Sequence, residues 1–287
     1  MSECELVAMH YREFLPQSPL NRFIECFWTL VSEDTSEPTH PERILPDGCV
    51  ELILNFGDRF SQHDGNTRHQ QPRHFLVGQM TGPILISPTG AVELIGIRFH
   101  PGGTLPFIRV PLNELTDQVV ELGGISASLE NQLLAVSSSL PIIEARVQAI
   151  ESLLLGCVLN SKRDSMLLAL AAKIVESGGL VSVDLLTKEA GVSTRQLERR
   201  FLYEVGLSPK LLSRILRFQQ VFRAVERCDG AWAPVALECG YYDQAHLIRD
   251  FNQFAHQTPG VLFAEQSQLT ESFTRKSRVS DFSNTTI

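Results

Sequence analysis

The sequence lacks a hydrophobic run that would span a membrane, a basic region at its start, and any pair of cysteines in C-x-x-C spacing. Its longest apolar stretches, such as Met166–Ala172, fall far short of the ~18 residues that a membrane helix needs. The first ten residues carry acids where a secretory signal would carry bases, so we expect no export. We interpret the cysteines as reduced, mostly buried thiols of a cytoplasmic protein. They are Cys4, Cys26, Cys49, Cys157, Cys228 and Cys239.

The composition is that of an ordinary globular protein, but the charge is unevenly distributed. The 287 residues are 43% hydrophobic and 20% charged, which excludes a disordered, collagen-like or coiled-coil chain and predicts one or two domains. A net charge of −8 argues at first against a nucleic-acid partner. Residues 1–162, however, hold 10 basic and 19 acidic residues, whereas 163–265 hold 12 of each. Within the second part, Ser193–Arg217 carries six Lys or Arg against two Glu, an excess that suits a phosphate backbone.

The first 120 residues have the pattern of a β-rich domain. Apolar segments such as Val50–Leu54 and Leu94–Phe99 predict strands, and turn-forming combinations of Pro, Asp and Gly separate them. The segments Glu33–His40 and Ser61–His74 are polar and predict loops. Short strands between such turns predict a small barrel or sandwich.

From about Leu112 the spacing of the apolar residues becomes helical. It predicts two helices, within 129–136 and 143–154, separated by Ser137–Pro141. Their apolar stripe lies next to a predicted domain boundary at Asn160–Arg163, and it favours a homodimer. The alternative is that the stripe packs on its own β-rich domain.

Two segments in the second half repeat one pattern. In each, a short apolar helix ends at a glycine, Gly191 or Gly240, and a capping residue, Ser193 or Asp243, begins the next helix. In both units a Leu follows four positions after the cap and a Phe eight positions after it. Two short helices joined by a turn that contains glycine are typical of a helix-turn-helix unit.

The predicted fold class is therefore α+β, with a β-rich barrel or sandwich and an all-α domain that holds two helix-turn-helix units. The predicted divisions are a β-rich regulatory domain at 1–120, a helical linker at 121–162, the double helix-turn-helix domain at 163–267, and a flexible tail at 268–287.

The second helix of each unit has the features of a DNA reader. Gln196 stands three residues after Ser193 and completes a capping box, and Asp243 suits the positive end of the other helix. Leu197 and Phe201 share one face, which leaves Arg195 and Arg199 on the opposite face.

In the other unit Leu247, Phe251 and Phe254 are expected to face inward, while Ala245 and Arg249 face outward. Small, polar and cationic side chains near the front of a capped helix suit the major groove.

A third helix is predicted between the two units. Ser208 and Pro209 are a strong start signal, and the apolar spacing continues to Arg227. About 20 residues at ~1.5 Å each give roughly 30 Å, and successive major grooves on one face of a duplex lie ~34 Å apart. The helix therefore has the length to hold two reading helices near one helical repeat.

These residues resemble the DNA-binding domain of the AraC/XylS family of bacterial transcription regulators. The resemblance covers about 163–265 and is most specific at Ala236–Phe251, followed by Thr258 and Pro259. It implies that helices at about 193–205 and 243–254 enter successive major grooves. The residues implied to contact bases are Arg195, Gln196, Glu198, Arg199, Gln244, Ala245, His246 and Arg249. Candidate phosphate contacts are Ser193, Arg200, Lys210, Arg214 and Arg217.

The N-terminal part resembles the corresponding domain of one branch of the same family, which has no well-known ligand. The resembling stretches are 45–55, 75–81, 96–103 and 111–116. The resemblance implies a regulatory or dimerising role for this domain and leaves the effector unidentified.

Arg98 and His100 alternate with apolar residues and share one strand face, so they are candidates for an effector pocket in which Arg98 clamps an anion. Trp28 is the third candidate for the effector pocket; the alternative is that it is a core residue. Cys49 beside Glu51 is better explained by burial than by nucleophilic chemistry.

The main alternative to a regulator is a metal- or sugar-binding β-barrel enzyme with an accessory helical domain; an adaptor that binds protein is the third. The N-terminal half contains several histidines but no His-x-His pair, so we expect no metal site. They are His10, His40, His63, His69, His74 and His100.

The sequence thus predicts a cytoplasmic, sequence-specific DNA-binding regulator without catalytic activity or cofactor. Its predicted partner is double-stranded DNA, and no membrane is expected. RNA polymerase, a small-molecule effector and a second copy of the chain are the further candidate partners. The effector, the operator, the oligomeric state and the choice between activation and repression do not follow from the sequence.

Overall fold

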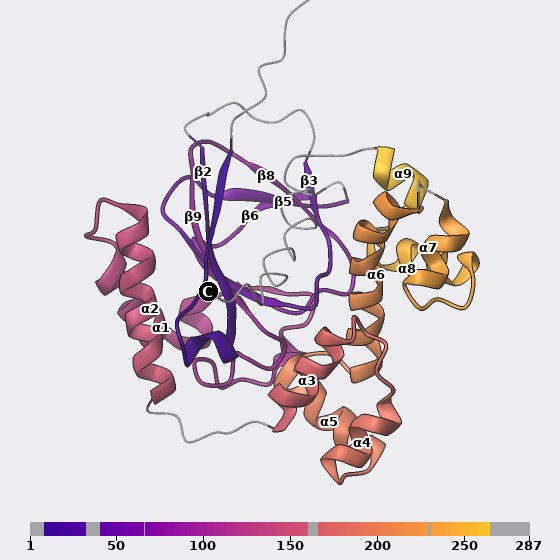
Figure 1. Ribbon diagram of the computed structural model, residues 1–287. Coiled ribbons are helices and arrows are strands. Elements are labelled where there is room, and N and C mark those ends of the chain that lie inside the picture. The colour runs from indigo at the N-terminus through magenta and orange to yellow at the C-terminus, as the bar shows by residue number, and fades with distance from the viewer. Residues whose placement is uncertain (1–8, 33–40, 66, 160–165, 229–230, 265–287) are drawn as a thin grey trace, which may run out of the picture.

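The computed structural model describes residues 9–32, 41–65, 67–159, 166–228 and 231–264. Within them the N-terminal part is β-rich and the C-terminal part is helical (Figure 1), which confirms the predicted α+β class. No helix in these ranges is long and apolar enough to cross a membrane.

The described strands pair antiparallel in two sheets. One sheet has six strands in the order β1-β2-β9-β4-β7-β10, and the other has four in the order β3-β8-β5-β6. The strands are β1 (His10–Phe14), β2 (Ile24–Ser32), β3 (Glu42–Ile44), β4 (Val50–Asn55), β5 (Phe60–Asp64), β6 (Thr67–Gln70), β7 (His74–Val77), β8 (Ile84–Pro88), β9 (Val92–Phe99) and β10 (Val119–Glu121). Two short 3-10 helices are η1 (Leu20–Arg22) and η2 (Leu112–Glu114).

The six-stranded sheet is buried on both faces. On β4, Leu52 and Leu54 belong to the apolar cluster on the outer face, while Ile53 packs with Trp28 and Phe75 between the two sheets. Because successive side chains of a strand point to opposite faces, a strand covered on both sides is a nearly continuous apolar run. This is why Val50–Leu54 alternates only partly in the sequence.

Two antiparallel helices, α1 (Leu122–Ser137) and α2 (Ile143–Leu159), cover the outer face of this sheet (Figure 1). They confirm the two helices predicted there. Leu133 of α1 and Ile150 of α2 are fully buried in one cluster with Leu52 of the sheet. The apolar stripe therefore packs on its own domain, as the alternative prediction had it. A homodimer remains a prediction that this stripe no longer supports.

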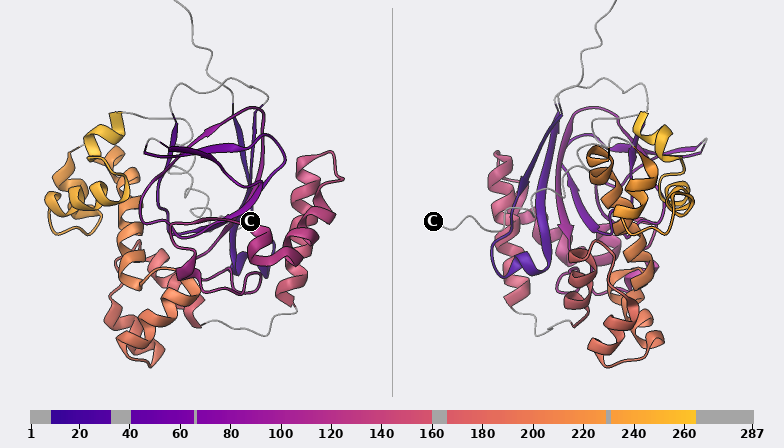
Figure 2. Two further views of the ribbon diagram at one scale, coloured as in Figure 1. Left: turned by 180° about the vertical axis from the view of Figure 1, so that it is seen from behind. Right: turned by 45° about the vertical axis from the view of Figure 1, so that its right-hand side comes forward.

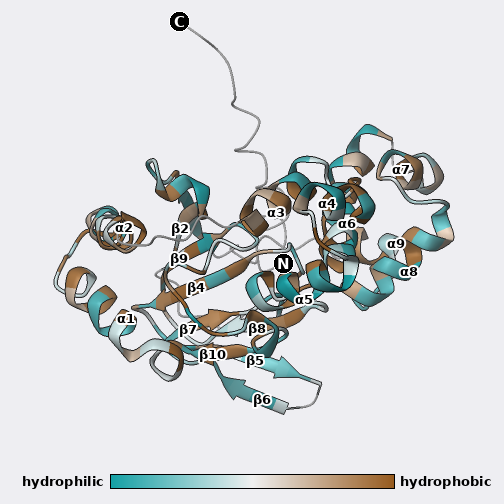
Figure 3. Ribbon diagram, turned by 90° about the horizontal axis from the view of Figure 1, so that it is seen from below, coloured by the Kyte–Doolittle hydropathy of each residue, from teal (hydrophilic) through white to brown (hydrophobic). Residues whose placement is uncertain are grey.

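The prediction of a loop at Ser61–His74 is wrong. Here β5 and β6 form a hairpin around Asp64 and Gly65, and β7 begins at His74. All of β6 is exposed (Figure 3), so it is an edge strand without the apolar alternation that marks a half-buried strand. The Asp-Gly pair was the hairpin signal in the sequence.

The other expectations for this half have mixed outcomes. Glu33–His40 and Asn160–Arg163 lie outside the described residues, as does Cys4. The five described cysteines are free, but only Cys26 and Cys239 are buried, so the expectation of mostly buried thiols is wrong. The three that retain exposure are Cys49, Cys157 and Cys228.

The described part of the C-terminal domain contains helices and turns but no strand. It contains two short helix pairs, α4–α5 and α7–α8, on either side of the long helix α6, with α3 and α9 completing the domain (Figure 2). The helices are α3 (Met166–Glu176), α4 (Val183–Ala190), α5 (Thr194–Val205), α6 (Pro209–Arg227), α7 (Trp232–Glu238), α8 (Gln244–Phe254) and α9 (Pro259–Ala264). This confirms both helix-turn-helix units and the predicted helix between them.

The centre of this domain is an aromatic cluster around Phe218 of α6. Its ring packs against Phe222 on the same helix and against Phe251 and Phe254 of α8, with centroids 4.8–5.5 Å apart. On the α5 side, Phe201 is likewise fully buried. Aromatic rings therefore fix α8 to α6, and α5 shares the same apolar core.

The turn of each unit depends on a glycine with positive φ, Gly191 at 63° and Gly240 at 72°. A Cβ at Gly191 would meet no atom within 4 Å, whereas one at Gly240 would lie 2.3 Å from Cδ2 of Leu180.

We predict that Gly191→Ala lowers the free energy of unfolding by about 1–2 kcal/mol through backbone strain alone. Gly240→Val should lower it further, because it adds a steric clash, and it should weaken DNA binding without touching DNA. Thermal melting and binding titrations of the two variants check this. If Gly240→Val melts at the same temperature as the native protein, the turn does not require a glycine at this positive φ.

Candidate nucleic-acid interface

The start of α5 is fixed by a capping box. The Ser193 hydroxyl accepts from the backbone N–H of Gln196 at 3.3 Å, and the Gln196 side chain accepts from the backbone N–H of Ser193 at 3.0 Å. This confirms the predicted box. Both side chains are exposed, but each is engaged in the cap, so their predicted contacts with DNA compete with the capping bonds.

The two faces of α5 are clearly separated. Leu197 and Phe201 are fully buried, while Arg195, Glu198 and Arg199 are exposed. The three exposed residues are predicted base contacts, so the structure places them together on the face away from the core.

Helix α8 is arranged in the same way. The Asp243 carboxylate caps it by accepting from the backbone N–H of His246 at 2.7 Å. Gln244, Ala245 and Arg249 are exposed, and Arg249 Nε donates to the carbonyl of Ala245 at 3.3 Å.

His246 is half-buried, with its ring edge-on to Tyr241 at 5.1 Å, so it is less available to DNA than its neighbours.

Helix α6 sets the separation of these two helices. It has 19 residues and is capped by Ser208, with Pro209 in its first turn, as predicted. Its length is about 28 Å at ~1.5 Å per residue, close to the ~34 Å between successive major grooves on one face of DNA.

The predicted phosphate contacts do not form one group. Lys210 is exposed, whereas Arg200 lies 3.8 Å from Glu204 on its own helix. Arg217 donates to the carbonyl of Gly179 at 3.0 Å.

Arg214 is held inside the domain. Its Nη2 donates to Asp250 at 2.6 Å and to Gln253 at 2.7 Å, and its guanidinium lies over the ring of Phe254. The Asp250 side chain is 1% exposed, so this ion pair joins α6 to the buried face of α8. Arg214 therefore orients the second reading helix, and the geometry does not favour a phosphate contact.

Two residues at this interface were not predicted. Tyr242 is 88% exposed directly before the cap of α8. Asp250 is an acid in the middle of the buried face formed by Leu247, Phe251 and Phe254. An acid at such a position requires a cationic partner, and that rule would have identified Asp250 from the sequence.

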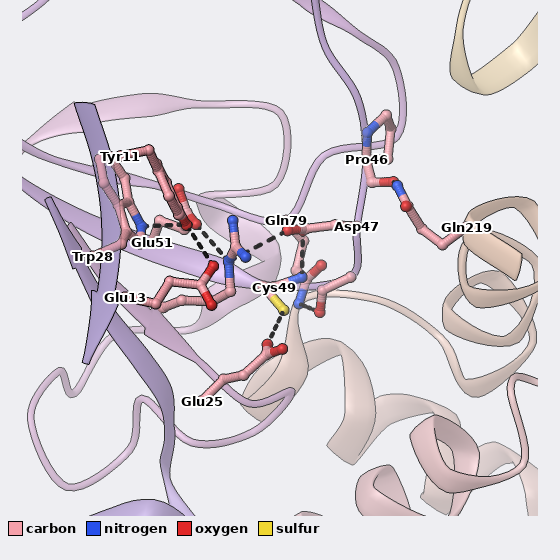
Figure 4. Close-up of polar contacts among 12 residues, drawn as sticks. Tyr11, Glu13, Glu25, Trp28, Pro46, Asp47, Cys49, Glu51, Gln79 and Gln219 are labelled. Atoms are coloured by element: carbon pink, nitrogen blue, oxygen red, sulfur yellow. Dashed lines mark hydrogen bonds and ion pairs between the residues drawn. The ribbon is translucent and has the colours of Figure 1, made fainter. Parts of the chain in front are cut away.

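The candidate effector residues of the N-terminal domain are not all together. Trp28 and Arg98 meet at Glu51: Trp28 Nε1 donates to Glu51 at 3.3 Å and Arg98 Nε donates to it at 2.7 Å (Figure 4). Both are buried and line a cavity between the two sheets. His100 instead lines a separate hollow beside Leu168 of α3.

The histidines of the β-rich domain are also dispersed. His63 lies against Ser87, His69 lies 3.5 Å from Asp64, and His74 lies 3.1 Å from Glu130 of α1. In the part of the chain that the structure describes, no three His, Cys, Asp or Glu side chains are grouped as metal ligands. His40 lies outside these residues.

Cys49 does not have the environment of a nucleophile. Burial, followed by the nearby carboxylates of Asp47 and Glu25, raises the pKa of its thiol well above the ordinary value. The thiol donates to Glu25 at 3.4 Å. Cys49 is therefore a protonated thiol at neutral pH.

Two family models match separate parts of the chain. Residues 12–121 match the family described as a domain of unknown function (DUF6597), and residues 186–265 match the family described as a helix-turn-helix domain.

A curated relative is the HTH-type transcriptional regulator MtrA of Neisseria gonorrhoeae, 28% identical over 128 residues. The match covers 44% of this chain and 42% of MtrA, so the chain spans less than half the length of this relative.

Solved structures with a similar arrangement include ToxT from Vibrio cholerae and the AraC-like transcriptional activator CuxR. ToxT has a TM-score of 0.43 at 11% identity, over 83% of this chain and 98% of its own. CuxR has a TM-score of 0.31 at 14% identity, over 83% of this chain and 88% of its own. At these scores the likeness carries no functional argument.

The C-terminal half is thus a DNA-binding domain with two helix-turn-helix units. It is a helix-turn-helix domain of the AraC type, and part of the chain is similar to the transcriptional regulator MtrA.

Arg214 gives a test of the interface. We predict that Arg214→Ala lowers the free energy of unfolding by about 3 kcal/mol, because it leaves the buried Asp250 without its partner. It should leave the salt dependence of DNA binding unchanged. Lys210→Ala is the matched control and should flatten the salt dependence by about one unit of slope with little effect on stability. Urea denaturation and binding titrations at several salt concentrations measure both. A loss of one unit of slope in Arg214→Ala would make it a phosphate contact after all.

Asp47 gives a second test. It lines the cavity between the two sheets, beside Arg98. Burial, opposed by Arg98 and reinforced by Glu51, raises the pKa of Asp47 to about 6. Its ordinary value is ~3.9. The folded state thus binds this proton more tightly than the unfolded state. The group's contribution to stability therefore falls as pH rises from about 4 through about 6.

Asp47→Asn should remove this fall while it keeps the acceptor for the backbone N–H of Cys49, which Asp47 Oδ1 binds at 2.9 Å. We expect the variant to gain stability relative to the native protein between pH 5 and pH 7, measured by urea denaturation at both. If the stabilities of the native protein and of Asp47→Asn change equally between pH 5 and pH 7, Asp47 is not the titrating group.

Proposed function

We propose that this protein regulates transcription by inserting α5 and α8 into successive major grooves of one DNA face. The observation that carries the proposal is the attachment of two capped helices, each with an exposed polar face, to the single helix α6. Aromatic rings attach α8 to α6, and α5 shares the same buried core, so the protein and not the DNA sets their spacing.

Within this proposal the two helices contribute differently. Arg195 and Arg199 suit guanine edges, and Glu198 suits the amino group of cytosine. On α8, Ala245 offers only a methyl contact to thymine, and His246 is partly withdrawn against Tyr241. Tyr242, which is exposed before the cap, supplements this weaker reading face.

The β-rich domain is the regulatory part of this proposal. It contacts both ends of the DNA-binding domain: Thr116 donates to the carbonyl of Gly206 at the end of α5, at 2.8 Å, and Arg43 donates to the carbonyl of Ala255 at the end of α8, at 3.0 Å. A small-molecule effector, RNA polymerase and a second copy of the chain are its candidate partners. The proposal includes no catalytic step.

Arg199 and Arg249 provide the decisive comparison, because both stand six residues after a cap and face away from the core. We predict that Arg199→Ala costs about 1–3 kcal/mol on a specific duplex and relaxes selectivity at one base pair. Arg249→Ala should alter sequence preference less, because α8 has fewer polar readers.

The measurement is a binding titration of both variants against a duplex selected from a random pool and against its scrambled form. Arg73→Ala, an exposed arginine of the β-rich domain, is the control and should change neither affinity. An equal loss on both duplexes in Arg199→Ala would make Arg199 a phosphate contact and the assignment of the first reading helix wrong.

A further inference from the structure

A cavity lies between the two sheets of the N-terminal domain. Its volume is about 60 Å³, several times the ~10–15 Å³ of such volume that one water needs. One end is polar, with Asp47, Cys49, Glu51 and Arg98 (Figure 4). The other walls are apolar and include Trp28, Ile53, Phe60, Phe75 and Met80.

The polar end carries an excess of negative charge. Arg98, whose side chain is 5% exposed, lies 2.7 Å from Glu51 and 3.7 Å from Asp47. Glu25 adds a third carboxyl group at the thiol of Cys49. Three carboxyl groups therefore surround one guanidinium, and such an imbalance away from water is unfavourable unless another positive charge balances it.

This charge distribution opposes the anionic effector predicted from Arg98. Nε of the guanidinium already faces Glu51 and Asp47, so an anion that entered the cavity would meet carboxylates. A cation would instead find a charge that complements its own.

The loop at 45–49 closes this polar end and also contacts the DNA-binding domain. Leu45 lines the cavity and belongs to the apolar core that contains Leu212 and Ile215 of α6. The carbonyl of Pro46 accepts from Gln219 Nε2 of α6 at 2.6 Å (Figure 4).

Gly48 lies in the same loop, at φ 85° and so close to α6 that a Cβ would be 2.9 Å from Cδ1 of Leu212. Its carbonyl accepts from Gln79 Nε2 at 2.7 Å. Gln79 is fully buried, and its Oε1 acceptor has no hydrogen-bond donor among the described residues. The loop is thus held between a buried side chain of the β-rich domain and the surface of α6.

We propose that this cavity binds a small organic cation of the amine class and that the 45–49 loop transmits its occupancy to α6. The ammonium group pairs with Asp47 and Glu51, and the short apolar body lies against Trp28 and Phe60. A ligand shifts a conformational equilibrium only by its differential affinity for the two states. In this protein the difference in affinity arises because Asp47, whose carboxylate pairs with the ligand, is part of the loop that contacts α6. The regulatory part of this inference rests on the proposed function, whereas the binding of the cation does not.

The binding step is tested on the full chain with propylammonium, and with 1-propanol and propionate as neutral and anionic analogues. Because Trp28 and Trp232 are the only tryptophans, Trp232→Phe makes Trp28 fluorescence a specific reporter of the cavity. We expect a saturable fluorescence change and a higher melting temperature with propylammonium alone. Asp47→Asn should weaken its binding at least tenfold, while Glu144→Gln on α2, outside the cavity, should leave it unchanged. Equal binding of 1-propanol or propionate, or the absence of any response to propylammonium, overturns the proposal.

The coupling step is tested with Gln219→Ala, which removes the hydrogen bond to Pro46. In the native protein propylammonium should change the affinity for the selected duplex at least threefold. In Gln219→Ala it should still bind within twofold of native affinity, but the change in DNA affinity should be lost. Gln220→Ala, whose native side chain lies against Gly178, is the matched control and should retain the response.

The outcomes separate the two proposals. A protein that binds the duplex but not propylammonium contradicts the cation site and leaves the DNA-binding function standing. A protein that binds propylammonium but no duplex contradicts the proposed function. A full DNA response in Gln219→Ala contradicts transmission through the loop.

Discussion

The packing of both reading helices on α6 is the interaction on which the rest of the structure depends. Phe218 of α6 contacts two aromatic rings of α8, and Phe201 of α5 is buried in the same apolar core as α6. Interiors packed at this density transmit displacement and do not absorb it. Any contact that moves α6 therefore moves both reading faces together, and the loop at 45–49 makes such a contact.

Charged side chains are used for two different purposes in the two domains. In the DNA-binding domain Arg214 neutralises Asp250 beneath α8, so the charge is balanced and serves orientation. In the β-rich domain Arg98 faces more carboxyl groups than it can neutralise. A buried ion pair whose charges cancel rigidifies its surroundings. A buried group of charges with an excess of carboxylates is stabilised when a cation binds to it.

The fold was predictable from the sequence where the signals are local. The capping box at Ser193, the cap at Asp243 and the Ser-Pro start of α6 specify helix ends within a few residues, and all three are present. The edge strand β6 was missed because a strand that is exposed on both sides has no apolar period.

The candidate sites were predictable only in part, because their chemistry depends on contacts between distant residues. The exposed faces of α5 and α8 follow from helical periodicity. The pairing of Arg214 with Asp250 spans 36 positions, and that of Arg98 with Glu51 spans 47. No spacing rule indicates such pairs, so one arginine was predicted to contact a phosphate and the other an anionic effector.

The most direct test of the central claim, that α6 holds two readers at one helical repeat, is the selection of bound duplexes from a random DNA pool by the full chain. The account predicts two conserved blocks of sequence whose centres lie about 10–10.5 base pairs apart. A single conserved block, or no enrichment over the starting pool, would contradict it.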